Sequence, residues 1–517
     1  MMAAQRLDQT PLLSSLLHGL AQVSAAQDVA ISGIALDSRQ VRPGYLFLAV
    51  AGTHVHGVDF LGDALAAGAA AIAWEPTETV DEGNAALRAA DIPAVAVTGL
   101  GRQVSLIADR FYGHPSQELF VVGVTGTDGK TSCTHFIAQA LHAPESTCGL
   151  VGTLGYGFYG ALRAGLHTTP DALTLQQELA ALRDAGAAAV AMEVSSHGLD
   201  QGRAANVDFD VAVLTNLSRD HLDYHGSEAA YAEAKRRLFT RPGLGSAVLN
   251  LDDAFGQSLY AELPTTLPVV VYAQALEAMQ SLARPNTRWI AARDIETSAR
   301  GMRITVDGSW GRGELQTGLL GRFNASNLLA SLAVLLIRGI SLDGALRRLA
   351  AVRTVPGRME AFGGDAEYPL VVVDYAHTPR ALEQVLIALR EHCTGHLWCI
   401  VGAGGERDVG KRPLMGAIAE RLADHVMLTD DNPRHEDATQ IVMDILAGME
   451  DADAVYVQRN RAEAIAQAVA NSGPGDIVLV AGKGHEDYQQ IGDRRLPYSD
   501  REQVMALLAH RVDGRAP

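Results

Sequence analysis

The sequence contains few cysteines, four in 517 residues, and none of them belongs to a CxxC pair. A disulfide framework needs a denser set of cysteines, and a structural zinc site needs closely spaced ligands. The composition therefore argues against a disulfide-stapled secreted protein and against a zinc protein. We expect the four residues to be buried, reduced thiols of a cytosolic protein: Cys133, Cys148, Cys393 and Cys399.

Long apolar segments are also missing. The longest, LLASLAVLLIRGI, begins at Leu328, contains Arg338 and is shorter than the roughly 20 residues that a membrane-spanning helix needs. The N-terminal stretch is interrupted by Asp8 and Pro11 and has no continuous apolar core, so we expect no signal peptide. These features predict a soluble, cytoplasmic protein without membrane insertion.

Positive charge is scarce as well. Lys and Arg together number 42 against 60 for Asp and Glu, which gives a formal net charge of −18. Broad electrostatic attraction to nucleic acid or to an anionic membrane is therefore not expected. Any anionic ligand has to be held by locally placed Arg and Lys side chains and by backbone N–H groups.

The sequence is rich in short apolar runs that alternate with helical patterns. Hydrophobic residues make up 48% and charged residues 20%, as in globular proteins, and the length suggests about three domains. Continuous apolar strands between helices predict an α/β fold whose parallel sheets are covered on both faces. We predict a small mixed α/β domain at 1–115, a central doubly wound domain at 116–352 and a second doubly wound domain at 353–517.

The most informative motif is VVGVTGTDGKTS at 121–132. A buried-strand pattern leads into a glycine turn and then a helix, so backbone N–H groups and a lysine can surround a polyphosphate while a hydroxyl reaches Mg²⁺. The common GxxxxGK[ST] spacing is not met, because Val124 stands where its first glycine would be. An isolated GKT fits an ordinary turn equally well, but the strand–turn–helix context favours binding of a nucleoside triphosphate.

Two later stretches, AMEVSSHGLDQGR and TNLSRDHLDYHG, each follow a predicted strand. Taken alone, each stretch is typical of an ordinary polar loop. However, a carboxylate such as Glu193 at a strand end beside a phosphate loop lies where Mg²⁺ needs a ligand. Lys235, in the following YAEAKRRLF, would by itself be an ordinary solvent-facing lysine. The second stretch concentrates four polar or metal-capable side chains, which favours function: Asp220, His221, Asp223 and His225.

In the C-terminal region four polar motifs, DYAHTP, GAGGERD, TDDNPR and AGKGHED, begin at predicted strand ends. Ligands of doubly wound sheets gather at the carboxyl ends of the strands, so these motifs should share one edge. Upstream, Asn324 and Asn327 lie three residues apart on one helical face, where their amides fit a base edge or a helix cap equally well. Arg358 offers a guanidinium that suits a terminal phosphate.

Taken in order, these motifs resemble the Mur ligase family of ATP-dependent amino-acid ligases in peptidoglycan synthesis. The resemblance covers nearly the whole chain, from LDSRQVRPGYLFLAVAG through TGTDGKTS, HTTPD, GRFNASN and DNPR to GKGHEDYQ. It is strongest to members that add meso-2,6-diaminopimelate to UDP-N-acetylmuramoyl-L-alanyl-D-glutamate. It implies a uridine-nucleotide-binding domain, a central P-loop ATPase and a Rossmann-like C-terminal domain for the amino acid, which agrees with the partition above. We expect a monomer.

The resemblance also implies a mechanism. The D-glutamate γ-carboxylate attacks the γ-phosphate of ATP, and the diaminopimelate amine then displaces phosphate from the acyl phosphate. Phosphorylation makes the carboxylate a good acceptor, and Mg²⁺ offsets the repulsion between the anions. The implied catalytic residues are Lys130, Glu193, His221 and a carbamylated Lys235, whose anionic carbamate would help to place Mg²⁺. The implied metal ligands are Thr131, Glu193, His221 and the Lys235 carbamate.

By position, the resemblance assigns three sets of binding residues. ATP would contact Gly126, Thr127, Asp128, Gly129, Lys130, Thr131, Ser132, Asn324, Asn327, Arg358, Asp374 and His377. The UDP-N-acetylmuramoyl-dipeptide would contact Leu36, Ser38, Thr53, His54, Val55, Thr168, Thr169, Ser195, Gln201 and Arg203. Diaminopimelate would contact Arg407, Asp431, Asn432, Pro433, Arg434, Gly482 and Glu486. Two positions depart from the family pattern, His167 in place of Asn and Ser132 in place of Thr.

The choice of amino acid depends on one arginine. Diaminopimelate has a distal ammonium–carboxylate centre that lysine lacks; Arg434 can grip the carboxylate with two hydrogen bonds, while Glu486 meets the ammonium. A lysine-adding ligase is therefore disfavoured, and a folylpolyglutamate synthetase-like ligase is disfavoured by DNPR, GKGHED and the N-terminal domain. A P-loop nucleotide switch leaves the C-terminal motifs unexplained. A dinucleotide oxidoreductase is disfavoured because no GxGxxG motif opens either doubly wound region.

Overall fold

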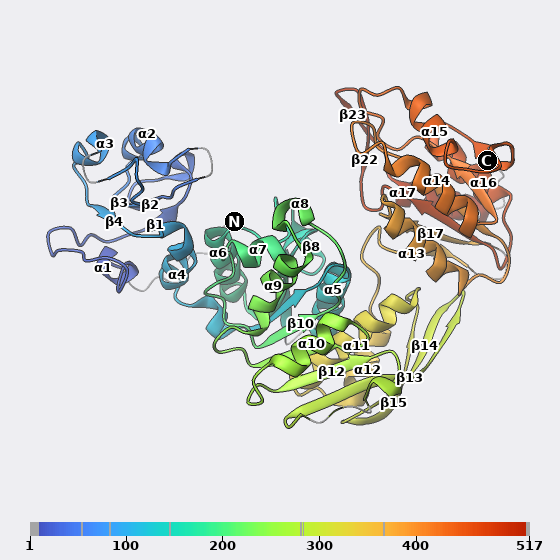
Figure 1. Ribbon diagram of the computed structural model, residues 1–517, viewed down its shortest axis with the longest axis horizontal. Coiled ribbons are helices and arrows are strands. Elements are labelled where there is room, and N and C mark those ends of the chain that lie inside the picture. The colour runs from blue at the N-terminus through green and yellow to red at the C-terminus, as the bar shows by residue number, and fades with distance from the viewer. Residues whose placement is uncertain are drawn as a thin grey trace. The chain divides into compact units, whose positions relative to one another are not determined.

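The computed structural model describes residues 10–52, 55–81, 84–143, 146–279, 282, 284–364 and 368–512. Strands and helices alternate along most of the chain (Figure 1), as predicted for an α/β protein. The chain divides into two compact units. The first comprises Met1–Tyr272, Ser281–Trp289 and Ala333–Gly339, and the second comprises Ala273–Gln280, Ile290–Leu332 and Ile340–Pro517.

A small parallel sheet opens the first unit. Its elements are α1 (Leu13–Leu16), β1 (Gly33–Ala35), η1 (Ser38–Gln40), β2 (Tyr45–Ala49), η2 (Gly57–Phe60), α2 (Leu61–Ala66), β3 (Ala71–Trp74), α3 (Ala85–Arg88), β4 (Ala94–Ala96) and α4 (Leu100–Phe111). The strand order is β1-β2-β3-β4. Leu46 and Leu48 pack towards α4, whereas Phe47 and Ala49 pack towards α2 and α3, because successive side chains of a strand point to opposite faces.

The first unit also contains the central sheet. Its elements are η3 (Pro115–Glu118), β5 (Phe120–Thr125), α5 (Lys130–Leu141), β6 (Thr147–Gly152), β7 (Gly155–Phe158), β8 (Ala161–Arg163), α6 (Ala172–Asp184), β9 (Ala187–Glu193), α7 (Ser196–Asp200), β10 (Val211–Leu214), α8 (Leu222–His225), α9 (Glu228–Phe239), β11 (Ser246–Asn250), α10 (Ala254–Glu262) and β12 (Val269–Ala273). The order is β12-β11-β10-β5-β9-β6-β7-β8, parallel from β12 to β6. Every residue of β5, β10 and β12 is buried, so both faces are covered as predicted.

This topology places three of the sequence motifs at one edge. Strands β9, β5 and β10 are neighbours and run in the same direction, so their carboxyl ends meet. Val194 N donates to the Val124 carbonyl at 2.8 Å, and Thr127 N donates to the Asn216 carbonyl at 2.9 Å. The phosphate-loop motif and the two polar stretches after β9 and β10 are therefore adjacent.

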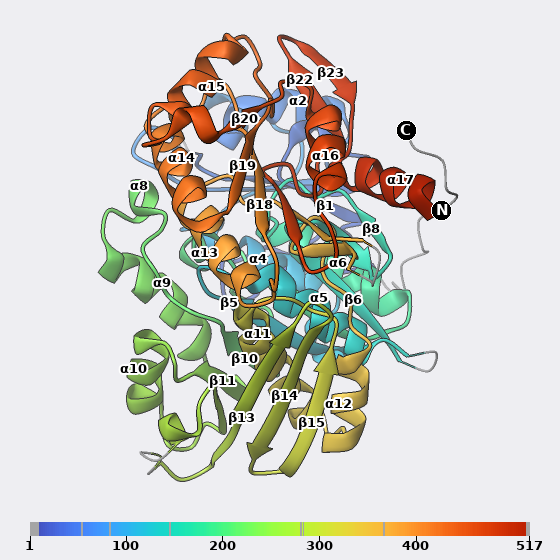
Figure 2. The same cartoon turned by 90° about the vertical axis from the view of Figure 1, so that its right-hand side faces the viewer.

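The second unit begins with three strands that the sequence pattern did not reveal, followed by the predicted helix that carries Asn324 and Asn327. Its elements are η4 (Leu276–Met279), β13 (Thr287–Ser298), β14 (Gly301–Gly308), β15 (Gly311–Thr317), α11 (Arg322–Ile337) and α12 (Leu342–Ala350), of which β13 and α11 also contribute residues to the first unit. The three strands form an antiparallel ladder that is visible in Figure 2. Their charged exposed residues and a register shift between Ala292 and Asp294 interrupt the apolar alternation that would have identified them.

The rest of the second unit is a doubly wound sheet. Its elements are β16 (Glu360–Gly363), β17 (Leu370–Asp374), α13 (Pro379–Arg390), β18 (Leu397–Val401), α14 (Lys411–Leu422), β19 (His425–Leu428), α15 (Ala438–Leu446), η5 (Ala452–Ala454), β20 (Tyr456–Val457), α16 (Arg461–Ala470), β21 (Ile477–Ala481), β22 (Tyr488–Ile491), β23 (Arg494–Pro497) and α17 (Asp500–Val512). The order is β16-β17-β21-β18-β19-β20, parallel except for β16.

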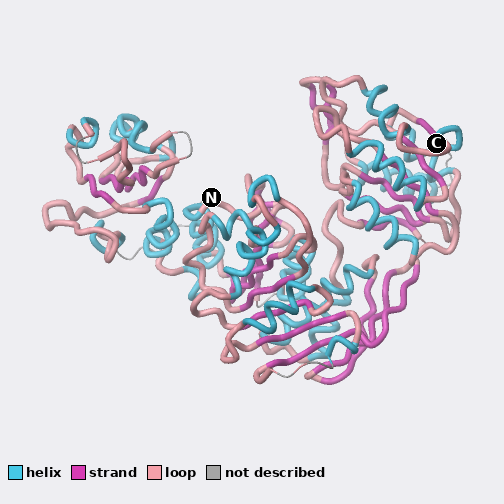
Figure 3. Tube along the Cα trace, viewed as in Figure 1, coloured by secondary structure: helices cyan, strands magenta, loops and turns pink. Residues whose placement is uncertain are grey.

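Helices cover both faces of this C-terminal sheet. Residues of α13, α14 and α15 pack on one face, and residues of α16 and α17 pack on the other. Figure 2 shows β18 and β19 between these two groups of helices, and Figure 3 shows the strands flanked by helices. The predicted second doubly wound domain is confirmed, with β22 and β23 forming a separate hairpin. The domain boundaries at 115 and 352 stay predictions.

Two expectations about missing features can be compared with the structure. In the part of the chain that the structure describes, no helix is both long and apolar enough to cross a membrane. None of the four cysteines, all of which lie among the described residues, forms a disulfide bond, and Cys133, Cys148 and Cys399 are buried as expected. The prediction is wrong for Cys393, which is partly exposed because it lies in the turn that follows α13 rather than on a strand or a packed helix face.

Candidate active site

The loop between β5 and α5 has the geometry of a phosphate-binding turn. Gly126 and Gly129 have φ angles of +152° and +82°, which favour glycine. A Cβ at Gly126 would lie 1.8 Å from Thr215 Oγ1, so a larger residue does not fit. Lys130 begins α5, and its Nζ donates to the carbonyls of Gly126 and Thr127, both at 2.9 Å. The ammonium is thus held against the loop that is expected to bind the triphosphate.

Glu193, the last residue of β9, reaches the same loop from the neighbouring strand. Its buried carboxylate accepts a hydrogen bond from Thr131 Oγ1 at 3.0 Å and another from Thr153 N at 2.8 Å. Burial raises the pKa of Glu193, against the opposing effects of Lys130 and of these donors. A carboxylate and a hydroxyl in contact are the hard oxygen ligands that Mg²⁺ prefers.

Lys235, on α9, is buried, so the interpretation of this residue alone as a solvent-facing lysine is wrong. Its Nζ donates to the Gly126 carbonyl at 2.7 Å and lies 4.5 Å from the centre of the Tyr231 ring. Burial, reinforced by the charge of Lys130, lowers the pKa of Lys235 well below its ordinary value. A neutral amine is the form that adds to carbon dioxide, so this environment favours a carbamate.

Tyr231 connects several of the predicted residues, although the sequence analysis did not single it out. Its hydroxyl lies 3.1 Å from Thr127 Oγ1, and its ring packs against Lys235. The His221 ring lies 6.0 Å from the Tyr231 ring and 4.9 Å from the His197 ring, measured between centroids. The tyrosine that opens YAEAKRRLF was the available signal. His221 itself has a φ angle of +51° and a side chain that is 46% exposed.

The residues predicted to contact the dipeptide in this unit gather beside Glu193. Thr169 Oγ1 donates to the Glu193 carbonyl and accepts from Ser195 N, both at 2.9 Å. Arg203 Nη1 donates to the Thr169 carbonyl at 2.6 Å, and its Nε donates to Gln201 Oε1 at 2.9 Å. Thr168 also joins this cluster, because its hydroxyl lies 3.0 Å from that of Thr153. His167 contributes its carbonyl to Tyr156, a bond that does not depend on the side chain.

The uridine-nucleotide contacts predicted for the N-terminal sheet are placed only in part. Leu36 and Ser38 follow the carboxyl end of β1, where Ser38 is buried and begins η1. Val55 is an exposed apolar side chain. Thr53 and His54 lie outside the described residues. The uridine contact therefore stays a prediction.

The predicted adenine and phosphate contacts of the second unit fall in two places. Asn324 and Asn327 are buried at the start of α11, where Asn327 Nδ2 donates to Asn324 Oδ1 at 3.1 Å. Asn324 Nδ2 in turn donates to the Leu320 carbonyl at 2.8 Å. At least part of the hydrogen-bonding capacity of these amides is therefore used to stabilise the start of the helix.

The second place is the DYAHTP loop after β17. Asp374 is buried and accepts from Met359 N at 2.7 Å. Burial raises the pKa of Asp374, against the opposing charge of Arg358. The Arg358 guanidinium lies 4.7 Å from the centre of the Tyr375 ring, and His377 Nδ1 lies 2.8 Å from the Tyr375 carbonyl. The loop thus brings Arg358, Asp374 and His377 together.

The stretch TDDNPRHED follows β19 and carries Arg434 among acidic residues. Arg434 has a φ angle of +52°, and its Nη1 donates to the Gly405 carbonyl of the GAGGERD loop at 2.5 Å. The predicted meeting of these two motifs at one edge is confirmed. The acidic residues of the stretch bond to other partners instead: Asp430 to Arg459, Asp431 to Lys483, Glu436 to Arg412, and Asp437 to the first turn of α15.

The other residues predicted for the amino-acid pocket lie around these two loops. Gly482 has a φ angle of +115°, and a Cβ there would lie 3.2 Å from Asp431 Oδ2. Asn432 Nδ2 donates to Glu486 Oε2 at 2.9 Å. A Cβ on Gly404 would lie 3.7 Å from Arg407 Cγ, which places the exposed Arg407 on the same loop that Arg434 contacts. Pro433 is buried between these residues.

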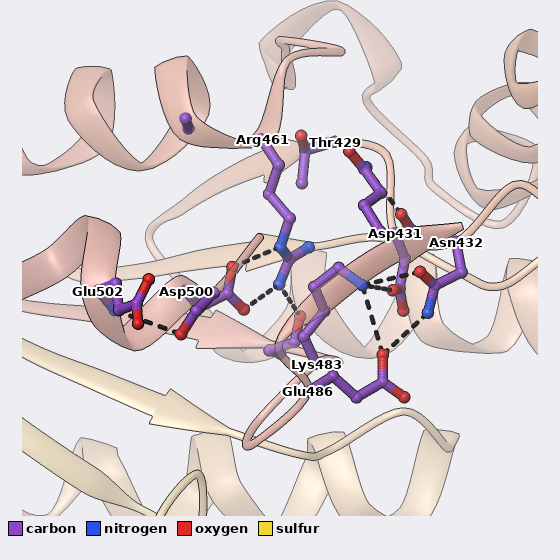
Figure 4. A network of polar contacts seen from close by, with 12 residues as sticks. Thr429, Asp431, Asn432, Arg461, Lys483, Glu486, Asp500 and Glu502 are labelled. Carbon is purple, nitrogen blue, oxygen red and sulfur yellow. Dashed lines mark hydrogen bonds and ion pairs between the residues drawn. The ribbon is translucent and has the colours of Figure 1, made fainter. Parts of the chain in front are cut away.

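The sequence analysis missed three buried cations in the C-terminal sheet region, Lys483, Arg461 and Arg412. Lys483 contacts Asp431, Asn432 and Glu486 (Figure 4); its signal was the lysine inside GKGHED. Arg461 forms two hydrogen bonds with Asp500, at 2.7 and 2.8 Å. Arg412 pairs with Glu436 and donates to the Gly404 carbonyl, so it holds both loops together. Sequence alone gives no reason to bury an arginine of an amphipathic helix.

The Thr131 hydroxyl and the Glu193 carboxylate, in contact beside the phosphate loop, are ligands of the kind that Mg²⁺ uses. Among the described residues, no three His, Cys, Asp or Glu side chains gather closely enough to form a metal site by themselves. Mg²⁺ is commonly held by one or two carboxylates together with substrate phosphates and water. The Thr131–Glu193 pair beside the phosphate loop fits that pattern, and a carbamate on Lys235 would add a second anionic ligand.

Three family models match the chain in the order of its sheets. The Mur ligase family catalytic domain matches residues 30–112, the Mur ligase middle domain matches 124–335, and the Mur ligase glutamate ligase domain matches 357–484. The chain belongs to the Mur ligase family. The Mur ligase matches extend from the N-terminal sheet to the GKGHED motif, as the sequence resemblance predicts.

Individual Mur ligases are similar over nearly the full length. A relative from Alkalilimnicola ehrlichii is 52% identical, covering 96% of this chain and 98% of that protein, and one from Pseudomonas aeruginosa is 52% identical, covering 94% and 96%. Both are named UDP-N-acetylmuramoyl-L-alanyl-D-glutamate–2,6-diaminopimelate ligase. A solved structure with the same name is 34% identical, with a TM-score of 0.75 and coverage of 98% of this chain and 100% of that chain.

Proposed function

We propose that the protein is an ATP-dependent ligase that adds meso-2,6-diaminopimelate to UDP-N-acetylmuramoyl-L-alanyl-D-glutamate in the cytoplasm, as a step of peptidoglycan precursor synthesis. The observation that carries this proposal is the meeting of the residues predicted to bind the amino acid, where Arg434 Nη1 donates to the Gly405 carbonyl and Asn432, two residues earlier, donates to Glu486 Oε2. A pocket with both signs of charge suits an amino acid with a distal ammonium–carboxylate centre. Relatives that are 52% identical and carry this name support it.

The reaction proceeds in two steps, formation of an acyl phosphate and its attack by an amine. The γ-carboxylate of the D-glutamate attacks the γ-phosphorus of ATP, and ADP leaves. The neutral amine of diaminopimelate then attacks the acyl carbon, phosphate leaves with the electrons of the C–O bond, and the new amide nitrogen loses a proton. Lys130 binds the triphosphate, and the glycine loop places backbone N–H groups around it. Thr169, Ser195 and Arg203 orient the dipeptide.

Mg²⁺ belongs to the same proposal. When bound, it would supply the positive charge that allows a carboxylate to approach a triphosphate. Thr131 and Glu193 would hold it, together with His221 and the Lys235 carbamate. The assignment of the Lys235 carbamate is supported by the burial of this side chain, which favours the neutral amine that reacts with carbon dioxide. The unmodified amine donates to the Gly126 carbonyl and brings no negative charge to the site.

The three sheets suggest the distribution of substrates. We assign the uridine nucleotide to 1–115 with Leu36, Ser38, Thr53, His54 and Val55, ATP mainly to 116–352, and the amino acid to 353–517. Asn324, Asn327, Arg358, Asp374 and His377 are assigned to ATP. Gln201 and Thr168 complete the dipeptide set, and Arg407, Asn432, Pro433 and Gly482 complete the diaminopimelate set.

One assay tests the proposed function against its alternatives. Phosphate release from ATP is measured with the UDP-linked dipeptide and, in turn, diaminopimelate, lysine or glutamate. We expect release that depends on diaminopimelate and a product whose mass has increased by one diaminopimelate residue. Best release with lysine would identify a lysine-adding ligase. In a parallel reaction with a folate substrate in place of the dipeptide, release that depends on glutamate would identify a folylpolyglutamate synthetase. Hydrolysis without any amino acid would favour a nucleotide switch.

A further inference from the structure

Lys483 is enclosed by the residues of the proposed amino-acid pocket (Figure 4), and its side chain is 0% exposed. Four oxygens surround its Nζ: Asn432 Oδ1 and the Tyr488 carbonyl, both at 2.9 Å, Asp431 Oδ1 at 3.1 Å and Glu486 Oε2 at 3.3 Å. Burying an ammonium with two carboxylates carries a desolvation cost that apolar side chains avoid, so stability alone is a weak reason for this arrangement.

The first consequence concerns Glu486. Its Oε2 accepts from Asn432 Nδ2 at 2.9 Å and lies 3.3 Å from Lys483 Nζ. Both contacts use the same oxygen, and in Figure 4 the other oxygen points away from the network. The side chain is 18% exposed, so a ligand can reach it. Lys483 and Asn432 therefore orient Glu486 with one oxygen directed towards an incoming ammonium.

The second consequence concerns Arg434. The Tyr488 carbonyl that accepts from Lys483 belongs to the first residue of β22. Further along this hairpin, the Gln490 carbonyl accepts from Arg434 N at 3.1 Å, and Gly492 N donates to the Arg434 carbonyl at 2.7 Å. These bonds hold Arg434 at a φ angle of +52°, which a residue other than glycine adopts only when the surrounding structure imposes it.

We propose that Lys483 is a positioning residue that sets the spacing between the Glu486 carboxylate and the Arg434 guanidinium, and thereby selects an amino acid with a distal ammonium–carboxylate centre. Lys483 acts on Glu486 directly and on Arg434 through β22. This inference rests on the proposed function. A charge pair that is held rigidly discriminates between ligands by geometry, because a ligand that lacks one of the two groups leaves a desolvated charge without a partner.

The test compares Lys483→Met with a matched control in the same sheet. Methionine keeps the length of the side chain and removes the charge. Arg390→Met removes an ion pair with Asp424, whose distance is 2.8 Å. Asp424 immediately precedes β19, whereas the residues of the proposed pocket follow β19. The control pair therefore lies at the amino ends of the strands, opposite the proposed pocket. Both variants lose a charged contact, and only one loses the proposed positioning.

For Lys483→Met we expect KM for diaminopimelate to rise about 10- to 100-fold, because small displacements of positioning groups cost that much. The kcat and the KM values for ATP and the UDP-linked dipeptide should stay close to those of the parent. The preference for diaminopimelate over lysine should fall by a similar factor. Arg390→Met should keep the parental preference. Unchanged diaminopimelate kinetics in Lys483→Met, or an equal loss for all three substrates, would overturn the proposal.

A double variant keeps the proposal testable if Lys483→Met alone does not fold. Lys483→Met/Glu486→Gln removes one charge of each sign and is compared with Glu486→Gln alone. If Lys483 acts through Glu486, adding Lys483→Met to Glu486→Gln should raise the diaminopimelate KM by clearly less than the 10- to 100-fold expected in the parent. A further rise of 10- to 100-fold over Glu486→Gln would overturn the proposal. The proposed function fails separately, if the parent itself does not turn over diaminopimelate.

Discussion

Arg434 shows how one side chain is assigned a role by its surroundings. In the sequence it stands among acidic residues, but in the structure those acids bond to Arg459, Lys483, Arg412 and the first turn of α15. Its guanidinium is instead held by one backbone carbonyl, that of Gly405. A guanidinium has five N–H donors, so Arg434 keeps capacity for a carboxylate ligand.

Arg434→Ala tests this assignment. We expect KM for diaminopimelate to rise roughly 30- to 150-fold, because a charged hydrogen-bonding partner of the substrate is lost. This rise corresponds to a loss of about 2–3 kcal/mol in binding free energy. ATP binding, measured by calorimetry with a nonhydrolysable analogue, should be unchanged. Arg459→Ala is the control, because Arg459 pairs with Asp430 in the same stretch. Equal loss of ATP and diaminopimelate binding would mean that Arg434 is structural.

Lys235 is a second residue whose environment predicts its chemistry. Its lowered pKa supports carbamate formation, and we expect Lys235→Ala to lose about 10- to 100-fold in kcat, as when a metal-positioning group is removed. Short carboxylates such as formate should restore part of the activity by occupying the position of the carbamate. Arg237→Ala, on the exposed side of the same helix, should remain active without additives. Full activity of Lys235→Ala would contradict the assignment.

At the scale of elements, the β5–α5 turn depends on Gly126. Alanine there would place its Cβ 1.8 Å from Thr215 Oγ1 at a φ angle of +152°. We expect Gly126→Ala to lower the free energy of unfolding by about 1–3 kcal/mol and to abolish detectable ATP binding. Gly160→Ala, in the turn between β7 and β8, is the control. Gly160 also has a positive φ angle, +84°, but a Cβ there would meet open space. Normal ATP binding by Gly126→Ala would show that this turn does not hold the triphosphate.

The Arg412–Glu436 pair connects α14 to the loop before α15, and it makes a pH prediction. The Arg412 guanidinium lowers the pKa of Glu436 to about 2, below the value of about 4.3 in an unfolded chain. A depressed folded-state pKa stabilises the protein above pH 4.3, and this contribution is lost as the pH falls towards 2. Glu436→Gln should therefore lower the urea midpoint at pH 7 and flatten its decline on acidification. A decline of the urea midpoint on acidification that is as steep in Glu436→Gln as in the parent would contradict the pairing.

At the scale of the whole molecule, the thiols report on the packing of both units. Burial raises the pKa of Cys148 and of Cys399 to about 12, and it also raises that of Cys133. We expect one thiol, Cys393, to react with a disulfide reagent in the native protein, and four to react after unfolding in urea. A reducing agent should leave the thermal midpoint unchanged. Prompt reaction of more than one native thiol would mean that a core is more open than the structure shows.

Much of the fold followed from local pattern. Apolar runs bounded by glycine turns identified β5, β9, β10 and the strands of the C-terminal sheet, because a buried parallel strand must be apolar on both faces. The strands β13, β14 and β15 were missed, because an exposed antiparallel ladder tolerates charged residues and a register shift. The phosphate loop was found for the same local reason, since glycine is required wherever φ is positive and space is short.

The sequence by itself determined the order of the motifs, the edge at which each would lie and the family to which the chain belongs. Only the tertiary structure decided which polar side chains are buried together. Lys235 reads as a surface lysine until α9 packs it against Gly126, and Lys483 acquires its partners only when β21, the β22 hairpin and the loop after β19 meet. The pKa of a buried amine and the spacing of two charges depend on contacts between residues far apart in sequence, which no local pattern encodes.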